Sequence, residues 1–450
     1  MISNNSEFLQ ISFLCLQCNF DKTIRMLHYN KIRQIAANLY VVYFLVGMSF
    51  SEEASSQQTL NLDYFINVAR SNNPILNDYN NQAFILKIDS LKLKSDYGFK
   101  LDGIVDATYS PVVNKLGYDI ALSNGQSVTG IVKLSKEIIG KGNINSRKES
   151  YGLGIQHLVN ESQITVQSLN RAITEQYINT YASQQQYQVI NEVVHLLEQE
   201  DQILNKLTQK TTFKQTDYLS FKVTLQQNLL TLKQCYAEWK NEYALLNYLA
   251  GIVDADIQNI DPPALDEDRF VPFEESIYAQ KSNIDSLKLT NEAKIINYNY
   301  KPRLSAYADA GYSSTFTIAP YKNLGWSAGV SLSIPIYDGN KKKMQLRQNK
   351  LSQDTRARYS EFTRKQYEQQ ILQLQDQIMQ YNQMIKVSNE QMVYAKTLIE
   401  ANLKQLPTGD VKVVDFIFSI NSYLNLKSGL IKYETNLYTL RNYLHNLIIQ

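Results

Sequence analysis

The sequence predicts a mainly α protein with a β-barrel portion, built from two tandem repeats that each combine paired long helices with a two-strand hairpin. Only 9 prolines and 17 glycines interrupt its 450 residues, so the segments must be long. Two proline-free stretches, at about 144–208 and 340–405, carry apolar residues at helical spacing. Each stretch follows a segment of alternating apolar and polar residues, as from Trp326 to Ile336. That alternation is the pattern of a strand with one apolar face.

The alternating segments predict four strands, at about 103–113 and 127–138 in the first half and at 303–313 and 325–336 in the second. Each is about ten residues long, the length that a tilted strand needs to cross a bilayer. Two soluble hairpins that cap a coiled coil are the alternative. If the strands lie in lipid, four of them cannot close a barrel, so several copies must pool their strands and the attached helices must continue the wall as a tube.

The later helical stretch carries a heptad seam, because its apolar residues recur at alternating spacings of three and four. The seam consists of Ile371, Leu374, Ile378, Tyr381, Ile385, Met392, Ala395 and Ile399, with Ser388 in the remaining slot. The positions 198 residues earlier repeat the phase with more polar residues: Ile173, Gln176, Thr180, Ser183, Tyr187, Ile190, Val194, Leu197 and Asp201. The same shift takes Asp415 to Asp217. This offset predicts repeats at 52–260 and 261–450, after a leader and signal peptide at 1–51.

The N-terminal residues have the parts of an export signal preceded by an extra leader. From Met26 the sequence has two basic residues, an apolar run to Phe50, and then small and acidic residues. Ser49 and Ser51 suit the positions before a cleavage site, so we expect Met26 to be the true start and the mature protein to begin near Glu52. An uncleaved membrane anchor is the alternative, although the apolar run is shorter than the roughly 18 residues of a spanning helix.

Composition and reactive residues argue against several classes of protein. A formal net charge of +2, with 20% charged residues, gives no bias toward a nucleic-acid partner. Cys15 and Cys18 form a C-x-x-C pair without a strand-helix context or a second ligand pair, so we expect no redox or zinc site. The four histidines share no metal-binding spacing; they are His28, His157, His195 and His445. Without a phosphate-binding glycine loop or a G-x-S-x-G turn, we expect no enzyme, no metal and no cofactor.

Four motifs carry a resemblance to a known family. They are "LNLDYFINVARSNNPILNDY" at 60–79, "KPRLS" at 301–305, "SLSIPIYDG" at 331–339 and "TGDVKVVD" at 408–415. Their order and spacing, from about residue 59 to the end of the sequence, resemble the TolC-like outer-membrane efflux proteins, or outer membrane factors. The sequence departs from the family pattern at its first strand-to-helix corner, "EIIGKGN", and at Thr211, where the family has glycine. It also lacks an Asn-Pro pair in "SIYAQKSNIDSL".

The resemblance implies a homotrimer in the outer membrane of a Gram-negative bacterium, in contact with outer-membrane lipid. A twelve-stranded β-barrel would be continued by a periplasmic α-helical barrel. Such a channel is the exit duct of a tripartite efflux or type I secretion system, and it passes small molecules or proteins from an inner-membrane transporter and a periplasmic adapter (membrane fusion) protein. The sequence leaves drug efflux and type I secretion both open. An exported, non-channel coiled-coil structural protein or adhesin is the alternative.

The turn "PTGDVKVVDFIF" is the candidate site that the sequence singles out. We expect Gly409 to take the positive φ that ends a helix, Asp410 to cap the next helix, and Asp415 to lie in its first turns, where the helix dipole favours a carboxylate. Local helix stability is one interpretation, supported by Asp217 at the matching place. The resemblance implies another, in which three copies of Asp415 ring a pore mouth, with Phe418 where the family has a second aspartate. It also implies an adapter-docking surface with the candidates Thr211, Phe213, Asp217, Gly409 and Asp410.

Overall fold

The computed structural model describes residues 60–117, 125–209, 214–265, 271–316 and 319–448. These residues belong to one compact unit of the chain. The expected leader and signal peptide at 1–51 lie outside the described residues, as do the docking candidates Thr211 and Phe213.

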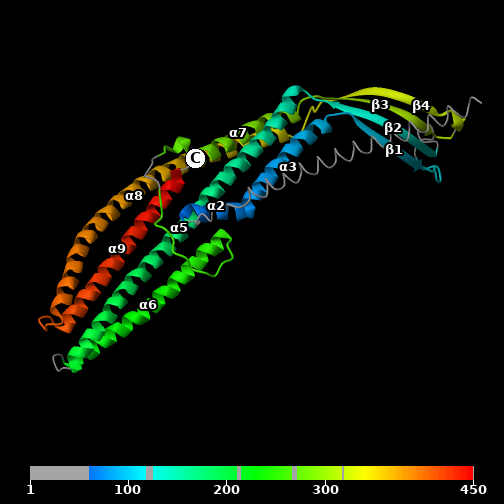
Figure 1. Cartoon of the computed structure of the whole chain (residues 1–450). Helices are drawn as coiled ribbons and strands as arrows, with labels where there is room; N and C mark the ends of the chain where they lie inside the picture. Colours follow the sequence, from blue (N-terminus) through cyan, green and yellow to red (C-terminus); the bar gives the residue numbers. More distant parts are fainter. Residues whose placement is uncertain (1–59, 118–124, 210–213, 266–270, 317–318, 449–450) are drawn as a thin grey trace, which may run out of the picture. The chain divides into compact units, whose positions relative to one another are not determined.

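Two very long helices, each followed by a second long helix, dominate the described chain (Figure 1). α5 (Lys141–Gln209) and α8 (Lys341–Gln405) confirm the two predicted helical stretches. Each is followed by a helix of 36 residues, α6 (Gln215–Ala250) or α9 (Val413–Ile448). At 1.5 Å per residue, the 69 residues of α5 extend over about 100 Å. Among the described helices, none combines the length and the hydropathy that a membrane-spanning helix requires.

Shorter helices precede the strands of the first half. α2 (Leu62–Asn72) begins after Asn61, whose side chain accepts a hydrogen bond from the Tyr64 N–H. α3 (Pro74–Asp96) begins after Asn73, which caps the helix in the same way. Pro74 suits the first helical position, since the N–H that proline lacks would have no partner there. The Asn-Pro pair of the motif at 60–79 therefore separates two helices and starts the second.

The second half begins differently, because it lacks the Asn-Pro pair. A short 3-10 helix, η1 (Phe273–Glu275), leads directly into α7 (Ile277–Asn299). The Ser276 hydroxyl caps α7 by accepting a hydrogen bond from the Ala279 N–H at 3.3 Å. α7 has 23 residues, the same length as α3. A serine cap thus starts the second of these helices without the family's motif.

Four antiparallel strands form one sheet in chain order. They are β1 (Lys100–Tyr109), β2 (Gln126–Ile138), β3 (Arg303–Ser314) and β4 (Leu324–Ser333), with the 3-10 turn η2 (Pro320–Lys322) before β4. β2 pairs with β3, so the strands of both halves share one ladder of hydrogen bonds. β2 and β3 lie close to the predicted bounds. β1 begins three residues and ends four residues before its predicted bounds, and β4 ends three residues early. Pro111 and Pro335 lie just beyond those two ends, and proline cannot donate to a ladder.

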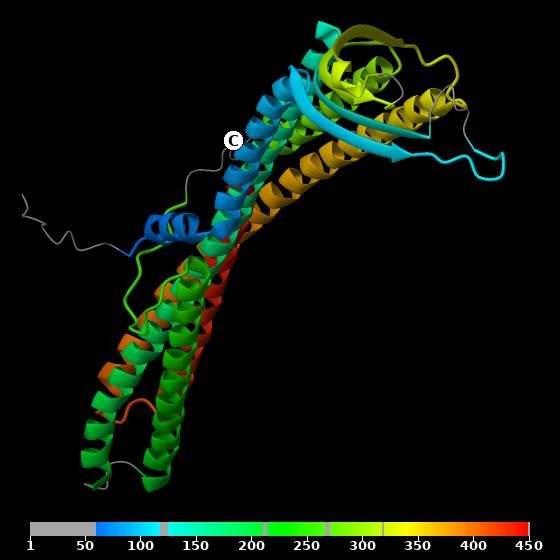
Figure 2. The same cartoon turned by 90° about the vertical axis from the view of Figure 1, so that its right-hand side faces the viewer.

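The long helices pack along the predicted seams. All nine seam positions of α8, and all nine positions 198 residues earlier in α5, are buried or half-buried. α6 covers α5 and α9 covers α8, and α5 also contacts α2, α3, α7 and α9. Figure 2 shows the long helices lying side by side from a second direction. α5 is therefore surrounded by other helices of the same chain, while much of α8 is exposed.

Candidate functional site

The register of the sheet sorts its side chains into an apolar face and a polar face, because directly paired residues point to the same side. One row across the four strands contains Leu101, Leu134, Ala308 and Ala328. The exposed side chains of this face include Leu101, Val105, Val132, Leu134, Trp326, Val330 and Leu332. No other described segment of the chain packs over these side chains. The sheet therefore presents one apolar, solvent-exposed face of four strands.

The next row, on the opposite face, contains Asp102, Lys133, Asp309 and Ser327. The Ser327 hydroxyl donates to Asp309 Oδ2 at 2.8 Å. Lys133 Nζ lies 5.1 Å from the centre of the Tyr307 ring, which suits a cation–π contact. Polar groups on this face therefore contact one another across neighbouring strands.

A glycine makes room for the tyrosine of the polar face. Tyr307 pairs with Gly329, and a Cβ added at Gly329 would lie 2.6 Å from the tyrosine oxygen. The Tyr307 ring therefore lies over β4, in the space that a side chain at position 329 would occupy. Ile104 and Ile131, which pair with each other, are apolar exceptions on this face. Lys136, near the end of β2, is a charged exception on the apolar face. The predicted alternation is confirmed along 304–310 and 326–333.

The outer edges of the sheet have no partner strand among the described residues. β1 pairs only with β2, and β4 pairs only with β3. Each edge strand therefore presents a row of backbone N–H and C=O groups without a ladder. Many exposed edges carry prolines or a bulge that discourages pairing, but β1 and β4 contain no proline. Both edges are suited to pairing with further strands.

The turn between α8 and α9 has the geometry that ends a helix with a glycine. Gly409 has φ of +81°, which confirms the predicted positive φ. Its N–H donates to the Leu406 carbonyl at 3.1 Å, and the Asp410 N–H donates to the Gln405 carbonyl at 3.2 Å. These are the two hydrogen bonds of a Schellman motif, in which glycine avoids the strain of a left-handed residue. The backbone of this turn is therefore fixed by its own hydrogen bonds.

The predicted capping role of Asp410 is wrong. α9 begins at Val413, and the Lys412 carbonyl accepts its first helical hydrogen bond, from the Phe416 N–H. Asp410 lies too early in the chain to cap this helix. Its carboxylate instead accepts a 2.6 Å hydrogen bond from the Thr408 hydroxyl. Asp410 therefore belongs to the end of α8 rather than to the start of α9.

The two acidic candidates lie in the first turns of α9 and α6, as predicted. Asp415 is exposed and Asp217 is half-buried. Phe418 is 68% exposed, one helical turn beyond Asp415. Its neighbour Phe416 is fully buried, because positions two apart on a helix point in different directions. Asp415 and Phe418 thus share an exposed side of α9, while Phe416 points into the protein.

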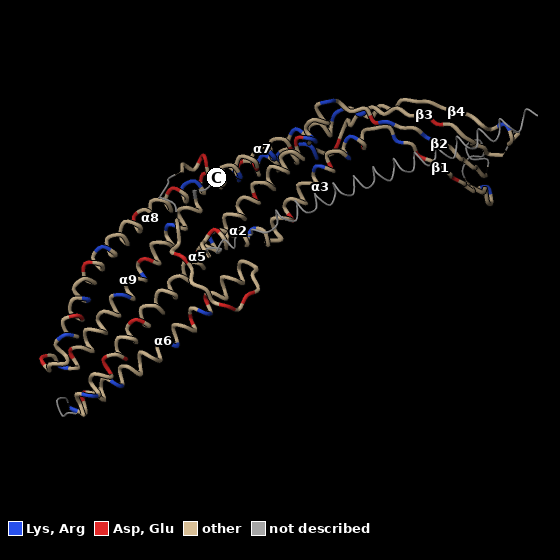
Figure 3. The backbone as a smooth tube through the Cα atoms, viewed as in Figure 1, with Lys and Arg blue, Asp and Glu red and all other residues tan. Residues whose placement is uncertain are grey.

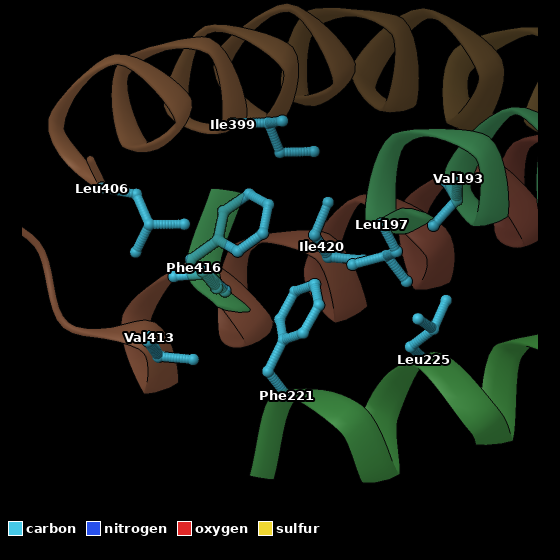
Figure 4. Packing of buried hydrophobic residues seen from close by; sticks show 10 residues of the cluster. Val193, Leu197, Phe221, Leu225, Ile399, Leu406, Val413, Phe416 and Ile420 are labelled. Carbon is cyan, nitrogen blue, oxygen red and sulfur yellow. The ribbon is translucent and has the colours of Figure 1, made fainter. Parts of the chain in front are cut away.

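A buried cluster joins the two helix turns, and we call it the tip cluster. It consists of Val193, Leu197, Leu204, Phe221, Leu225, Ile399, Leu406, Val413, Phe416 and Ile420. Figure 4 shows Phe221 of α6 and Phe416 of α9 facing each other, and their rings stack with centres 6.5 Å apart. Side chains from both helix pairs therefore fix where the first turns of α6 and α9 begin.

Comparisons with known proteins identify the fold. No protein-family model matches the chain, and no curated protein matches it in sequence. The structure is similar to the outer membrane protein VceC of Vibrio cholerae, with a TM-score of 0.70 and 14% identity over 86% of this chain and 95% of that one. It is also similar to the CmeC outer membrane channel of Campylobacter jejuni, with a TM-score of 0.67 and 14% identity over 87% of this chain and 86% of that one.

A third similar structure is the MtrE outer membrane channel of Neisseria gonorrhoeae, with a TM-score of 0.68 and 13% identity over 86% of this chain and 89% of that one. The chain has the fold of the TolC-like outer-membrane channels. This confirms the expected single-chain fold, which is mostly helical with a small antiparallel sheet. At these identities the shared TolC-like fold does not assign roles to individual side chains. The roles of residues in this chain follow from the contacts that they make.

Two charged features of the helix pair α5–α6 were not expected from the sequence. Lys222 Nζ lies 2.6 Å from Asp201 Oδ2 and forms an ion pair between α6 and α5. The hydrogen bond to Asp201 raises the pKa of Lys222. The neighbouring Glu200 is buried, its Oε2 has no hydrogen-bond partner in the described structure, and burial raises the pKa of its carboxyl.

Comparing each residue of the first half with the residue 198 positions later would have pointed to both features. Asp201 and Lys222 correspond to Ile399 and Ile420 in the second half. Glu200 corresponds to Leu398. Charged residues in the first half thus stand where the second half has apolar residues. Ile399 and Ile420 both belong to the tip cluster. A comparison of the two halves would have identified these charged positions, but not the distance between Asp201 and Lys222.

Proposed function

We propose that the chain is the outer-membrane channel of a tripartite efflux or type I secretion system in a Gram-negative bacterium. It would pass small molecules or proteins from an inner-membrane transporter and a periplasmic adapter to the outside. The observation that carries this proposal is the exposed apolar face that extends over β1, β2, β3 and β4. Apolar side chains of this kind are stable against lipid and costly against water. The proposed role includes no catalytic step.

The unpaired edges of the sheet support an assembly of several copies. Each unpaired backbone group in lipid costs several kcal/mol, so β4 of one copy must pair with β1 of the next. Three copies would give twelve strands, within the range of known membrane barrels. The polar face, with Asp102, Lys133 and Asp309, would then line the interior. The helices that follow β2 and β4 would continue the wall into the periplasm, as two repeats per chain at 52–260 and 261–450.

We place the periplasmic entrance of this channel at the helix turns. The Schellman turn around Gly409 and the first turns of α6 and α9 are held together by the tip cluster. Three copies of Asp415 would form a negative ring that favours cations. Phe418 would add an apolar constriction to that ring. The docking surface for an adapter would include Gly409, Asp410 and Asp217, with Thr211 and Phe213 in the other turn.

Reconstitution in lipid tests the proposal. Purified protein should resist carbonate extraction from outer membranes, run as a heat-modifiable trimer, and produce single-channel conductance in planar bilayers. A variant with Trp326→Lys and Val330→Lys on the apolar face should fail to insert. Ser327→Lys and Ser331→Lys, on the polar face of the same strand, form the matched control. Release of the wild-type protein by carbonate, with monomers only after crosslinking, would instead support an exported coiled-coil protein without a channel.

A further inference from the structure

Within the described strands, Lys136 is the one charged residue on the apolar face of the sheet. It pairs with Ala306 of β3, so its side chain lies on the same side as Leu134 and Ala308. Lys136 Nζ lies 4.3 Å from the centre of the Phe99 ring, which comes just before β1 and is 69% exposed. Among the described residues Lys136 forms no ion pair. A cation on an apolar face without a carboxylate partner calls for an anion from outside the chain.

The position of Lys136 along β2 matches the border of a bilayer. Gln126 and its partner Tyr109 end the apolar face at the far side of the sheet. Lys136 follows ten residues later, about 33 Å along the strand at roughly 3.3 Å per residue, and Ile138 is the last residue of β2 on this face. A strand tilted by about 40° rises about 25 Å over that length, which is the height of the apolar band of a membrane barrel. A lysine that faces lipid is tolerated at such a border and costly at the middle of the bilayer.

The end of the sheet that meets the helices is basic. We call its segments at 94–100, 136–141, 301–303 and 338–343 the basic collar. Nine of their residues are basic: Lys94, Lys100, Lys136, Lys141, Lys301, Arg303, Lys341, Lys342 and Lys343. Three are acidic: Asp96, Glu137 and Asp338. In Figure 3, Lys and Arg positions are likewise frequent where the strands meet the helices. The whole chain is nearly balanced, with 45 basic and 43 acidic residues, so positive charge is concentrated at this end of the sheet.

Two further lysines of the basic collar lie over aromatic rings, as Lys136 does. Lys301 Nζ lies 4.6 Å from the centre of the Tyr298 ring. Lys342 Nζ lies 5.8 Å from the centre of the Tyr300 ring. Aromatic rings are frequent at membrane–water interfaces, where lysines extend their ammonium groups toward the lipid headgroups. Basic residues near a membrane surface attract anionic lipids. The basic collar therefore has the composition of a headgroup-level surface, and Lys136 is its member on the apolar face.

We propose that Lys136 binds the phosphate group of a phospholipid headgroup in the inner leaflet of the outer membrane. The acyl chains of this lipid lie against the exposed apolar side chains of the sheet, and the Phe99 ring holds the ammonium group at headgroup level. The other lysines and arginines of the basic collar favour an anionic headgroup, such as phosphatidylglycerol, by electrostatic attraction. This inference rests on the proposed channel for placing the apolar face in lipid. It adds a binding site for one class of lipid at one residue of that face.

Two lysines on opposite faces of β2 test the site. Purified protein in mild detergent is titrated with dimyristoylphosphatidylglycerol, and the bound lipids are counted by native mass spectrometry. Lys136→Gln should weaken binding of the first lipid on each chain by about tenfold, as expected for the loss of one charge-assisted contact. Lys136→Arg, which keeps the charge, should bind like the wild type. Lys133→Gln is the matched control and should change nothing, because Lys133 also lies over an aromatic ring but points to the polar face.

The outcomes separate this inference from the channel itself. Conducting channels in which Lys136→Gln binds the lipid as tightly as the wild type, or in which Lys133→Gln weakens it equally, would overturn the site and leave the channel standing. Displacement of the lipid by an equal concentration of inorganic phosphate would indicate a site for free anions and would also overturn the proposal. Lipid binding that depends on Lys136 in a protein that forms no pore would overturn the channel and leave the site standing.

Discussion

The α5–α6 pair and the α8–α9 pair use the same seam positions with different chemistry. In α5, the buried Gln176 side chain donates to the backbone and the carboxylate of Glu242, at 3.0 and 2.7 Å. The Thr180 hydroxyl lies 3.1 Å from the same backbone carbonyl. The counterparts in α8, Leu374 and Ile378, instead join a buried apolar cluster. At these two seam positions the α5–α6 pair is thus stabilised by hydrogen bonds and the α8–α9 pair by apolar burial.

This difference follows the surroundings of each pair. α5 is contacted by α2, α3, α7 and α9 in addition to α6, whereas the described neighbours of α8 are chiefly α7 and α9. A helix with neighbours on most sides can satisfy buried polar groups within the chain. A helix with an open side keeps its own seam apolar and leaves a second apolar stripe exposed. The comparison teaches that the polarity of a heptad seam does not by itself report how deeply a helix is buried.

The largest expected effect comes from introducing the charged residues of the α5–α6 pair at the matching positions of the α8–α9 pair. Ile399→Asp copies Asp201 into the tip cluster and should lower the free energy of unfolding by about 3–5 kcal/mol, because the buried charge has no partner. Ile399→Asp with Ile420→Lys copies the whole ion pair and should recover part of that loss. Denaturant titration followed by helical circular dichroism in detergent measures both. If the double variant were no more stable than Ile399→Asp alone, the matching positions of the two helix pairs would not have equivalent surroundings.

A smaller effect is expected from breaking the ion pair where it exists. Lys222→Met leaves Asp201 without its cation and should cost about 1–2 kcal/mol, since the pair is partly exposed. Asp201→Ile with Lys222→Ile, which copies the residues of the α8–α9 pair, should restore stability close to that of the wild type. The same titration applies. If the double variant lost as much stability as Lys222→Met, apolar burial could not replace the pair at this position.

Glu200 offers a comparison that depends on pH. Glu200→Leu copies Leu398 and should raise stability at pH 7 by about 1 kcal/mol, because it removes a buried carboxylate whose Oε2 has no partner. Burial raises the pKa of this carboxyl in the folded protein, so the stability it contributes is present below the unfolded pKa and is lost as pH rises through the folded pKa. The advantage of Glu200→Leu should therefore shrink toward pH 4. An advantage that grew on acidification would contradict the assigned cause.

The smallest effect on stability is expected from the two first-turn aspartates. Asp415→Ala and Asp217→Ala each remove a carboxylate favoured by the helix dipole, worth about 0.3–1 kcal/mol. Only Asp415→Ala should also lower cation selectivity and multivalent-cation block in bilayer recordings, because we place Asp415 alone at the pore mouth. Asp217→Ala is its matched control. Equal behaviour of the two variants would remove the pore-mouth assignment and leave the channel proposal intact.

Much of the fold was readable from local periodicity. The spacing of apolar residues predicted α5, α8 and every seam position, because a helix places residues three and four apart on one side. Alternation predicted which strand residues share a face, because successive side chains in a strand point to opposite sides. Gly409 was predicted because only glycine takes a positive φ without strain. These features depend on residues close together in the sequence.

What the tertiary structure decided depends on residues far apart in the sequence. The pairing of β2 with β3 joins the halves in one sheet, and the contact of Asp201 with Lys222 needs two helices in register. Asp410 was assigned to the wrong helix because α9 begins only at Val413, whose buried side chain packs in the tip cluster. The sequence by itself determined the elements and their faces, since local sterics and hydrophobicity fix them. Only packing decided which faces meet and which stay exposed, because the burial of a side chain depends on which distant residues pack against it.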